Sequence, residues 1–165
     1  MHRFLPLLFP LGVLLIGSWP LSVQSEQRRP DYRQRPSGTF PSCQQAPGLD
    51  QQLLREGARL GITVVVGEPE VPGKDATYRA KPGRLGLITL RQRPMSAAVR
   101  CKLISHEFIH VLQHLHGDLR GVPPLGWPVP AAAVKRFGAV QEAEAYRYQN
   151  RAGYVLELLR QTPRP

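Results

Sequence analysis

Apolar residues recur along this chain with two different spacings, which together predict a mixture of helices and short strands. Leucines and an alanine follow helical spacing across residues 49–60, and Gly61 comes directly after them, so a first helix is expected there. The stretch ITVVV at 62–66 is β-branched throughout and precedes Gly67, which is typical of a buried strand.

Two further apolar runs flank a proline-glycine turn. These runs are ATYRA at 76–80 and LGLITL at 85–90, and KPGR at 81–84 separates them. A short turn of this composition between two β-prone stretches predicts an antiparallel hairpin.

The second half of the chain is predicted to be helical. Ser96 can cap a helix that runs to about His116 and ends at Gly117. After a loop rich in proline and glycine, residues 131–137 and 140–160 predict one or two further helices. The order of the elements predicts an α+β fold, in which a short antiparallel or mixed three-stranded sheet packs on helices.

Length and composition favour one folded domain. A chain of 165 residues can bury one proper core and is short for two. Residues 49–162 carry the periodic patterns and are assigned to this domain. Residues 26–48 are polar and rich in proline, and they are expected to form a flexible, extended segment rather than part of the core.

Residues 1–25 have the features of a signal peptide. A short basic start is followed by an apolar run at 4–16, and Val23 and Ser25 fit the positions before a cleavage site. Export to a periplasm, a lumen or the extracellular space is expected, with Glu26 as the first mature residue. The alternative is an uncleaved membrane anchor, although two prolines interrupt the run and it is shorter than the ~20 residues of a spanning helix.

The chain has two cysteines, Cys43 and Cys101, and neither has the spacing of metal ligands. An even number of cysteines in an exported protein predicts a disulfide. A bond between these two residues is favoured, and two free buried thiols are the alternative.

The formal net charge of +10 changes the expected partners little. Basic surfaces attract polyanions, but the positive residues are scattered and no nucleic-acid-binding motif accompanies them. No specific nucleic acid is therefore expected, and a weak association with an anionic membrane surface is the remaining possibility. The oligomeric state has no signal in the sequence.

The predicted helix that begins near Ser96 contains HEFIH. His106 and His110 lie four residues apart, so both project from one face and can reach a single Zn²⁺ ion. Glu107 is turned away from that face but remains close enough to hold a water on the ion. HExxH in an apolar helix therefore predicts a zinc site with a neighbouring base.

Two more histidines follow in the same helix. His114 is eight residues from His106, about 12 Å along the helix axis, which is too far to share one ion without distortion. His114 and His116 are therefore expected to be helix-end or surface groups, with a place in the wall of the site as a second role for His114.

A catalytic zinc usually has three protein ligands and one open position. The stretch QEAEAYRYQN at 141–150 supplies two candidates for the third ligand, Glu142 and Glu144. HEFIH followed by a helix with EAEAY resembles the gluzincin branch of HExxH metallopeptidases, and in particular the minimal gluzincins of the ImmA/IrrE type. The resemblance covers roughly residues 85–160 and implies a small zincin-like domain whose third ligand is a glutamate on a later helix.

In gluzincins, an aspartate or asparagine commonly follows the ligand by four residues and supports a histidine. This pattern favours Glu142 as the ligand, with Tyr146 in the supporting place, and leaves Glu144 with Tyr148 as the alternative. The glutamate that is not the ligand is expected on a solvated helix face with Arg147 as its ion-pair partner.

These features together predict zinc-dependent hydrolysis of peptide bonds. Glu107 is expected to act as the general base that takes a proton from a metal-activated water. Related folds keep an edge strand before the histidine helix, so residues 85–90 are expected to pair with a peptide or protein substrate. Candidates for stabilising the oxyanion are His114, Tyr146, Tyr148 and Arg147.

The loop at 117–130 connects the two predicted ligand helices. Leu125 and Trp127 in this loop either form a wall of the substrate cleft or belong to a rigid structural connection. A catalytically inactive zinc-containing module that binds peptides or a cell-envelope component is the main alternative function. A basic envelope-associated structural protein with an accidental motif is the third.

Overall fold

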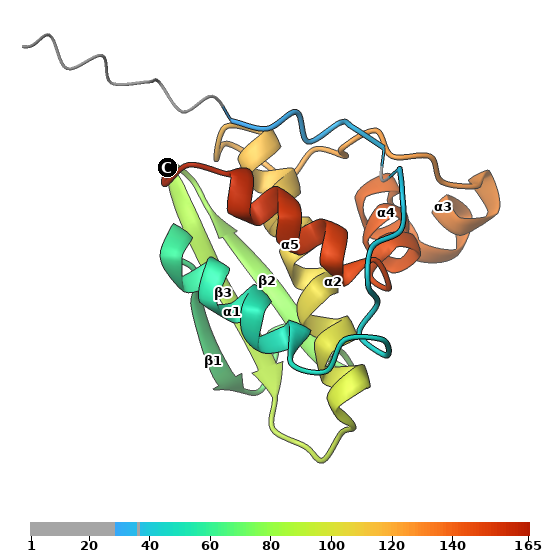
Figure 1. The fold of residues 1–165 in the computed structure, drawn as a ribbon. Coiled ribbons are helices and arrows are strands. Elements are labelled where there is room, and N and C mark those ends of the chain that lie inside the picture. Colours follow the sequence, from blue (N-terminus) through green and yellow to red (C-terminus); the bar gives the residue numbers. More distant parts are fainter. Residues whose placement is uncertain (1–28, 36) are drawn as a thin grey trace, which may run out of the picture.

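The computed structural model describes residues 29–35 and 37–165, so the predicted signal peptide lies outside the described residues. Within this range the chain forms helices and strands in the predicted order, which confirms the α+β class (Figure 1). Residues 140–160 divide into two helices. No helix of the described range combines the length and apolar character needed to cross a membrane. The elements are α1 (Leu49–Leu60), β1 (Thr63–Gly67), β2 (Ala76–Lys81), β3 (Arg84–Arg91), α2 (Ala97–His116), α3 (Ala131–Phe137), α4 (Val140–Tyr148) and α5 (Ala152–Gln161).

The three strands form a mixed sheet in the order β1-β3-β2. β3 is parallel to β1 and antiparallel to β2, and its Ile88 lies opposite Val64 on one side and Tyr78 on the other. The prediction that residues 85–90 form an edge strand is wrong, because the turn at 81–84 folds β2 along one side of β3 while β1 occupies the other. The edge strand next to the helices of the candidate site is β2.

The prediction that residues 62–66 form a buried strand is also wrong. β1 is the opposite edge of the sheet, and its Val65 and Val66 are 39% and 67% exposed. Ile62, just before the strand, is buried instead. A β-branched run favours an extended backbone whether or not both faces are covered, and here no second layer covers the outer face of β1 within the described part of the chain.

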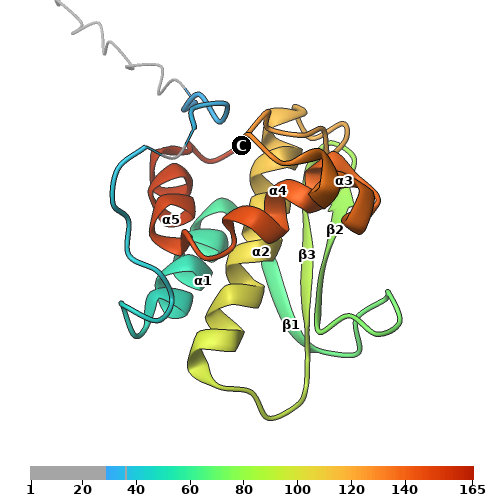
Figure 2. The same ribbon diagram turned by 90° about the vertical axis from the view of Figure 1, so that its right-hand side faces the viewer.

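Helix α2 lies at the centre of the fold. It packs against α1, α4 and α5 on its helical sides and against β2 and β3 on the other (Figure 2). All of its residues from 104 to 115 are therefore buried. The predicted cap at Ser96 is present, and α1 approaches α2 closely at Gly57, where an added Cβ would lie 2.4 Å from the ring of Phe108.

The described part of the segment before α1, residues 29–35 and 37–48, is attached to the core. Tyr32 is buried, and its carbonyl accepts a hydrogen bond from Trp127 Nε1 at 2.9 Å. The backbone N–H of Gly153 at the start of α5 donates to the carbonyl of Pro41 at 3.0 Å. These contacts hold the segment against the core. They involve its backbone carbonyls, so they do not depend on its polar side chains.

The predicted disulfide between Cys43 and Cys101 is confirmed. The two Cα atoms lie 5.7 Å apart, within the range that a disulfide can span. The bond joins the segment before α1 to the first turns of α2. An ion pair between Asp50 and Arg100 joins α1 to the same end of α2.

Candidate metal centre

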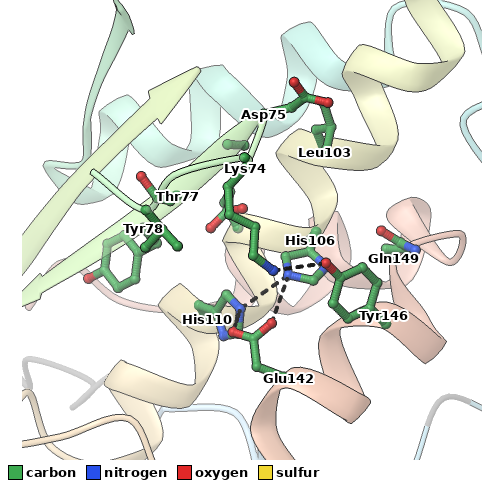
Figure 3. Close-up of a pocket in the computed structure, with 14 residues that line it drawn as sticks. Lys74, Asp75, Thr77, Tyr78, Leu103, His106, His110, Glu142, Tyr146 and Gln149 are labelled. Carbon is green, nitrogen blue, oxygen red and sulfur yellow. Dashed lines mark hydrogen bonds and ion pairs between the residues drawn. The ribbon is translucent and has the colours of Figure 1, made fainter. Parts of the chain in front are cut away.

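Two histidines of α2 face a cavity beside β2. His106 and His110 are four residues apart, so their side chains leave the helix in directions that differ by about 40°. Their Nε2 atoms lie 3.2 Å apart, and both side chains are buried. Figure 3 shows both rings directed toward the carboxylate of Glu142.

Glu142 joins this cluster from the first turn of α4. Its Oε1 lies 3.1 Å from Nε2 of His110, and its Oε2 lies 3.8 Å from Nε2 of His106. The imidazoles of His106 and His110 beside it hold the pKa of Glu142 well below its ordinary value. One ligand atom from each residue lies within 4.8 Å of the others, so the structure brings together the three residues predicted to hold a metal.

Glu107 lies in the same cavity and is buried. Burial raises the pKa of its carboxyl, and the nearby charges of His106 and His110 act in the opposite direction. The backbone of Tyr78 on β2 also acts to lower the pKa of this carboxyl. This placement is suited to proton transfer, and the role of general base stays a prediction.

The cavity over the cluster has a volume of about 270 Å³. Lys74, in the loop before β2, and Tyr146 on α4 both line it, and Lys74 Nζ donates to the Tyr146 hydroxyl at 3.0 Å (Figure 3). This hydrogen bond raises the pKa of Lys74. The Tyr146 ring lies edge-on to His106 at 4.6 Å and stacks on Phe137 at 4.1 Å. Tyr146 thus supports His106 through its ring, while its hydroxyl is directed to Lys74.

The prediction that the second glutamate lies on a solvated face is wrong. Glu144 is 0% exposed, and its two oxygens accept hydrogen bonds from the backbone N–H groups of Leu125, Gly126 and Trp127 and from Gln113 Nε2, all at 2.8–2.9 Å. The loop at 117–130 folds back over α4 and presents these donors. Because its oxygens are bound there, Glu144 does not join the histidines as the alternative third ligand.

His114 is not a surface group as predicted, since it is 1% exposed. Its Nδ1 lies 2.7 Å from the hydroxyl of Tyr78, which also accepts from the backbone N–H of Gly86 at 3.0 Å. Burial raises the pKa of Tyr78 to about 12 and lowers the pKa of His114. β2 covers this end of α2, so His114 lies behind Tyr78, whereas His116 is half-buried at the helix end as predicted.

Of the four candidates for stabilising an oxyanion, Tyr146 lines the cavity. The hydroxyl of Tyr148 donates to the carbonyl of Pro128 at 3.0 Å. The guanidinium of Arg147 lies over the Tyr148 ring, 5.9 Å from its centre, on an exposed side of α4. Neither Tyr148 nor Arg147 is directed into the cavity, because both lie on other faces of α4 than Glu142 does.

Leu125 and Trp127 belong to the structural connection and do not line the cavity. Trp127 is 2% exposed, and its ring packs edge-on against Tyr148 at 5.0 Å. Sequence analysis did not identify Lys74, because a single lysine in a polar loop has no pattern that points to a site. Gln113 did have a signal, since it follows His110 by three residues on one helix face.

Comparison of the chain with models of protein families, with curated proteins and with solved structures finds no match. The functional assignment therefore rests on the side chains. Two imidazoles and a carboxylate are ligands for a divalent cation, and Glu107 beside them can exchange a proton. Lys74 and Tyr146 can donate to negative charge that develops in the cavity.

Proposed function

We propose that this chain is a zinc-dependent metallopeptidase of the small gluzincin, zincin-like type, which hydrolyses a peptide or protein substrate. The observation that carries this proposal is the spacing of His106 Nε2, His110 Nε2 and the Glu142 oxygens, which lie 3.1–3.8 Å apart. Ligand atoms of a tetrahedral zinc site, about 2.0–2.1 Å from the ion, are about 3.3 Å from one another. Two imidazoles and one carboxylate are also a donor set that suits zinc.

His106, His110 and Glu142 would hold the zinc ion, which would supply a Lewis acid for polarising the scissile carbonyl and acidifying a water. Glu107 takes the proton of the attacking water and returns it to the leaving amine. Burial makes this carboxylate a stronger base by raising its pKa. The bonds exchanged are the peptide C–N bond, which breaks, and a new C–O bond to water.

The edge of β2 is the proposed binding surface for an extended substrate. In an antiparallel ladder, the backbone groups of alternate residues face opposite sides of the strand. The carbonyl of Asp75 accepts a hydrogen bond from the backbone N–H of Arg91 at the end of β3. The carbonyls of Ala76 and Tyr78 therefore face away from β3, on the side of the cavity that they line. A peptide strand can pair there and bring its carbonyl over the metal ligands.

Removal and replacement of zinc tests the proposed function. We expect the purified chain to bind about one zinc per molecule, to cleave members of a broad peptide library, to lose cleavage with a chelator and to regain it with added zinc. Glu142→Ala should fail to retain zinc because one of three ligands is lost, whereas Glu157→Ala on α5 should retain it. A wild-type chain without stoichiometric zinc would contradict the site. Zinc binding without cleavage would favour the inactive peptide-binding module.

Lys74→Met is expected to lower kcat by about 10²-fold, the usual cost of removing one donor to an oxyanion. The ammonium of Lys74, fixed by the Tyr146 hydroxyl, is positioned for charge that exists in the transition state, so KM should change little. Steady-state kinetics on one peptide measures both constants. Lys81→Met at the end of β2 is the matched control. A raised KM with unchanged kcat would show instead that Lys74 binds the ground-state substrate.

We also propose that the chain is exported. The disulfide between Cys43 and Cys101 supports this, because such bonds persist in oxidising compartments. N-terminal sequencing of the exported protein should begin at Glu26, and retention of Met1 would favour the membrane anchor instead. The weak association with anionic membranes that the net charge suggests remains part of this proposal.

A further inference from the structure

A chain of hydrogen bonds runs from the back of His110, away from the cavity, to Glu144. His110 Nδ1 lies 2.7 Å from Gln113 Oε1. Gln113 Nε2 donates to Glu144 Oε2 at 2.9 Å and to the backbone carbonyl of Gln141 at 3.0 Å. Gln113 and Glu144 are both 0% exposed, so these bonds are made without competition from solvent.

The chemistry of its partners fixes the orientation of the Gln113 amide. The remaining contacts of Glu144 are with backbone N–H groups of residues 125–127, so its carboxylate acts as an acceptor throughout. The Gln141 carbonyl is also an acceptor. Both partners at one end of the amide therefore require hydrogens, which identifies that end as the NH₂ group and places the amide oxygen against His110.

An amide oxygen can only accept a hydrogen bond, so His110 must carry its proton on Nδ1. In the neutral ring, Nε2 then holds the lone pair, and Nε2 is the atom that faces His106 and Glu142. We propose that Glu144, acting through Gln113, holds His110 in the tautomer and orientation that can bind the metal. This inference rests on the proposed zinc site, and it makes Gln113 and Glu144 positioning residues.

The same hydrogen bonds also fix the position of α4 relative to α2. Gln113 binds the backbone of Gln141, the neighbour of Glu142, so the helix that carries the third ligand is attached one turn beyond His110. Glu144 extends the attachment to the loop at 117–130. When a metal ligand loses the residue that hydrogen-bonds to it, metal binding typically weakens about 10- to 100-fold. Here the positions of two ligands, His110 and Glu142, depend on the amide of Gln113.

Zinc affinity, measured by competition with a chromophoric chelator, tests this role beside the unfolding free energy of the metal-free protein. Gln113→Met removes the acceptor for His110, and Glu144→Gln lets the Gln113 amide reverse, because the new amide can donate to it. We expect a Kd for zinc about 10- to 100-fold weaker in both variants. Glu157→Gln, the same exchange on α5, should leave the Kd unchanged.

A purely structural role predicts a different result. The metal-free variants would then be less stable, but the Kd for zinc would match that of the wild type, and this outcome would overturn the inference. Glu144→Gln keeps the size of both side chains, which covers the case that Gln113→Met does not fold. A wild type that binds no zinc overturns the site itself, whereas equal zinc binding by all variants overturns the positioning role alone.

Nuclear magnetic resonance of histidine-labelled, metal-free protein supplies a second readout. At a pH above the pKa of His110, where the ring is neutral, we expect a proton on Nδ1 of His110 in the wild type, protected from exchange with solvent by the bond to Gln113. In Glu144→Gln this proton should be lost from part of the population. An unchanged Nδ1 proton in that variant would show that Glu144 does not set the tautomer.

Discussion

Glu107→Gln is expected to lower kcat for peptide hydrolysis by about 10²- to 10⁴-fold, the contribution of a positioned general base. Glutamine has the same shape but cannot take a proton from water. Because the amide is close in size to the carboxylate, the cavity should keep its form. Because Glu107 is not one of the three clustered ligands, zinc should remain bound at about one per chain.

Two measurements give this result its meaning. Metal analysis of Glu107→Gln separates loss of the base from loss of zinc, and Glu157→Gln on α5 controls for the exchange itself. Wild-type activity in zinc-loaded Glu107→Gln would exclude Glu107 as the base. Loss of zinc in this variant would instead place Glu107 among the metal ligands, against the geometry of His106, His110 and Glu142.

The double variant Cys43→Ser/Cys101→Ser is expected to lose about 4 kcal/mol of unfolding free energy. The disulfide spans 58 residues, and closing a loop of that length lowers the entropy of the unfolded chain and raises its free energy by about this much in the chain-entropy account. Urea unfolding of the metal-free protein measures the difference. The fold should remain, because Cys43 and Cys101 are only two members of a large core, and the hydrogen bond between Trp127 and Tyr32 does not depend on them.

Wild-type protein under reducing conditions is the matched control, since it should unfold like the double variant. His106 lies more than one turn beyond Cys101, so zinc binding by the folded double variant should be unchanged. Equal stability of the oxidised wild type and the double variant would contradict the prediction. Two free thiols in denatured, non-reduced protein would contradict the bond itself.

Local patterns were sufficient for the elements and for half of the candidate site. Helical spacing predicted α1 and α2, and the turn at 81–84 predicted the hairpin of β2 and β3, because these features depend on residues close together in the chain. The separation of His106 and His110 by four residues placed them on one helix face before any fold was known. The choice of Glu142 came from the resemblance to gluzincins, and its position beside these histidines agrees with it.

The tertiary structure decided which element covers each residue. The spacing of apolar residues shows on which side of a helix or strand a residue lies. It does not show which other element packs against that side. The side-chain hydrogen bonds that the sequence analysis did not predict join distant parts of the chain. They link Tyr78 with His114 across 36 residues, Gln113 with Glu144 across 31, and Lys74 with Tyr146 across 72.

The same distinction explains the strands. A β-branched run and an alternating run both favour extended backbone, but the position of a strand in the sheet depends on which neighbours pair with it. β3 became central and β1 an edge because the hairpin and the parallel pairing occupy opposite sides of β3. By itself, the sequence therefore determined the elements, the histidine pair and the cysteine partners. Packing and hydrogen bonding between segments far apart in the chain decided the rest. They bury Glu144 and His114, place the ammonium of Lys74 in the cavity and leave one edge of β2 unpaired within the described residues.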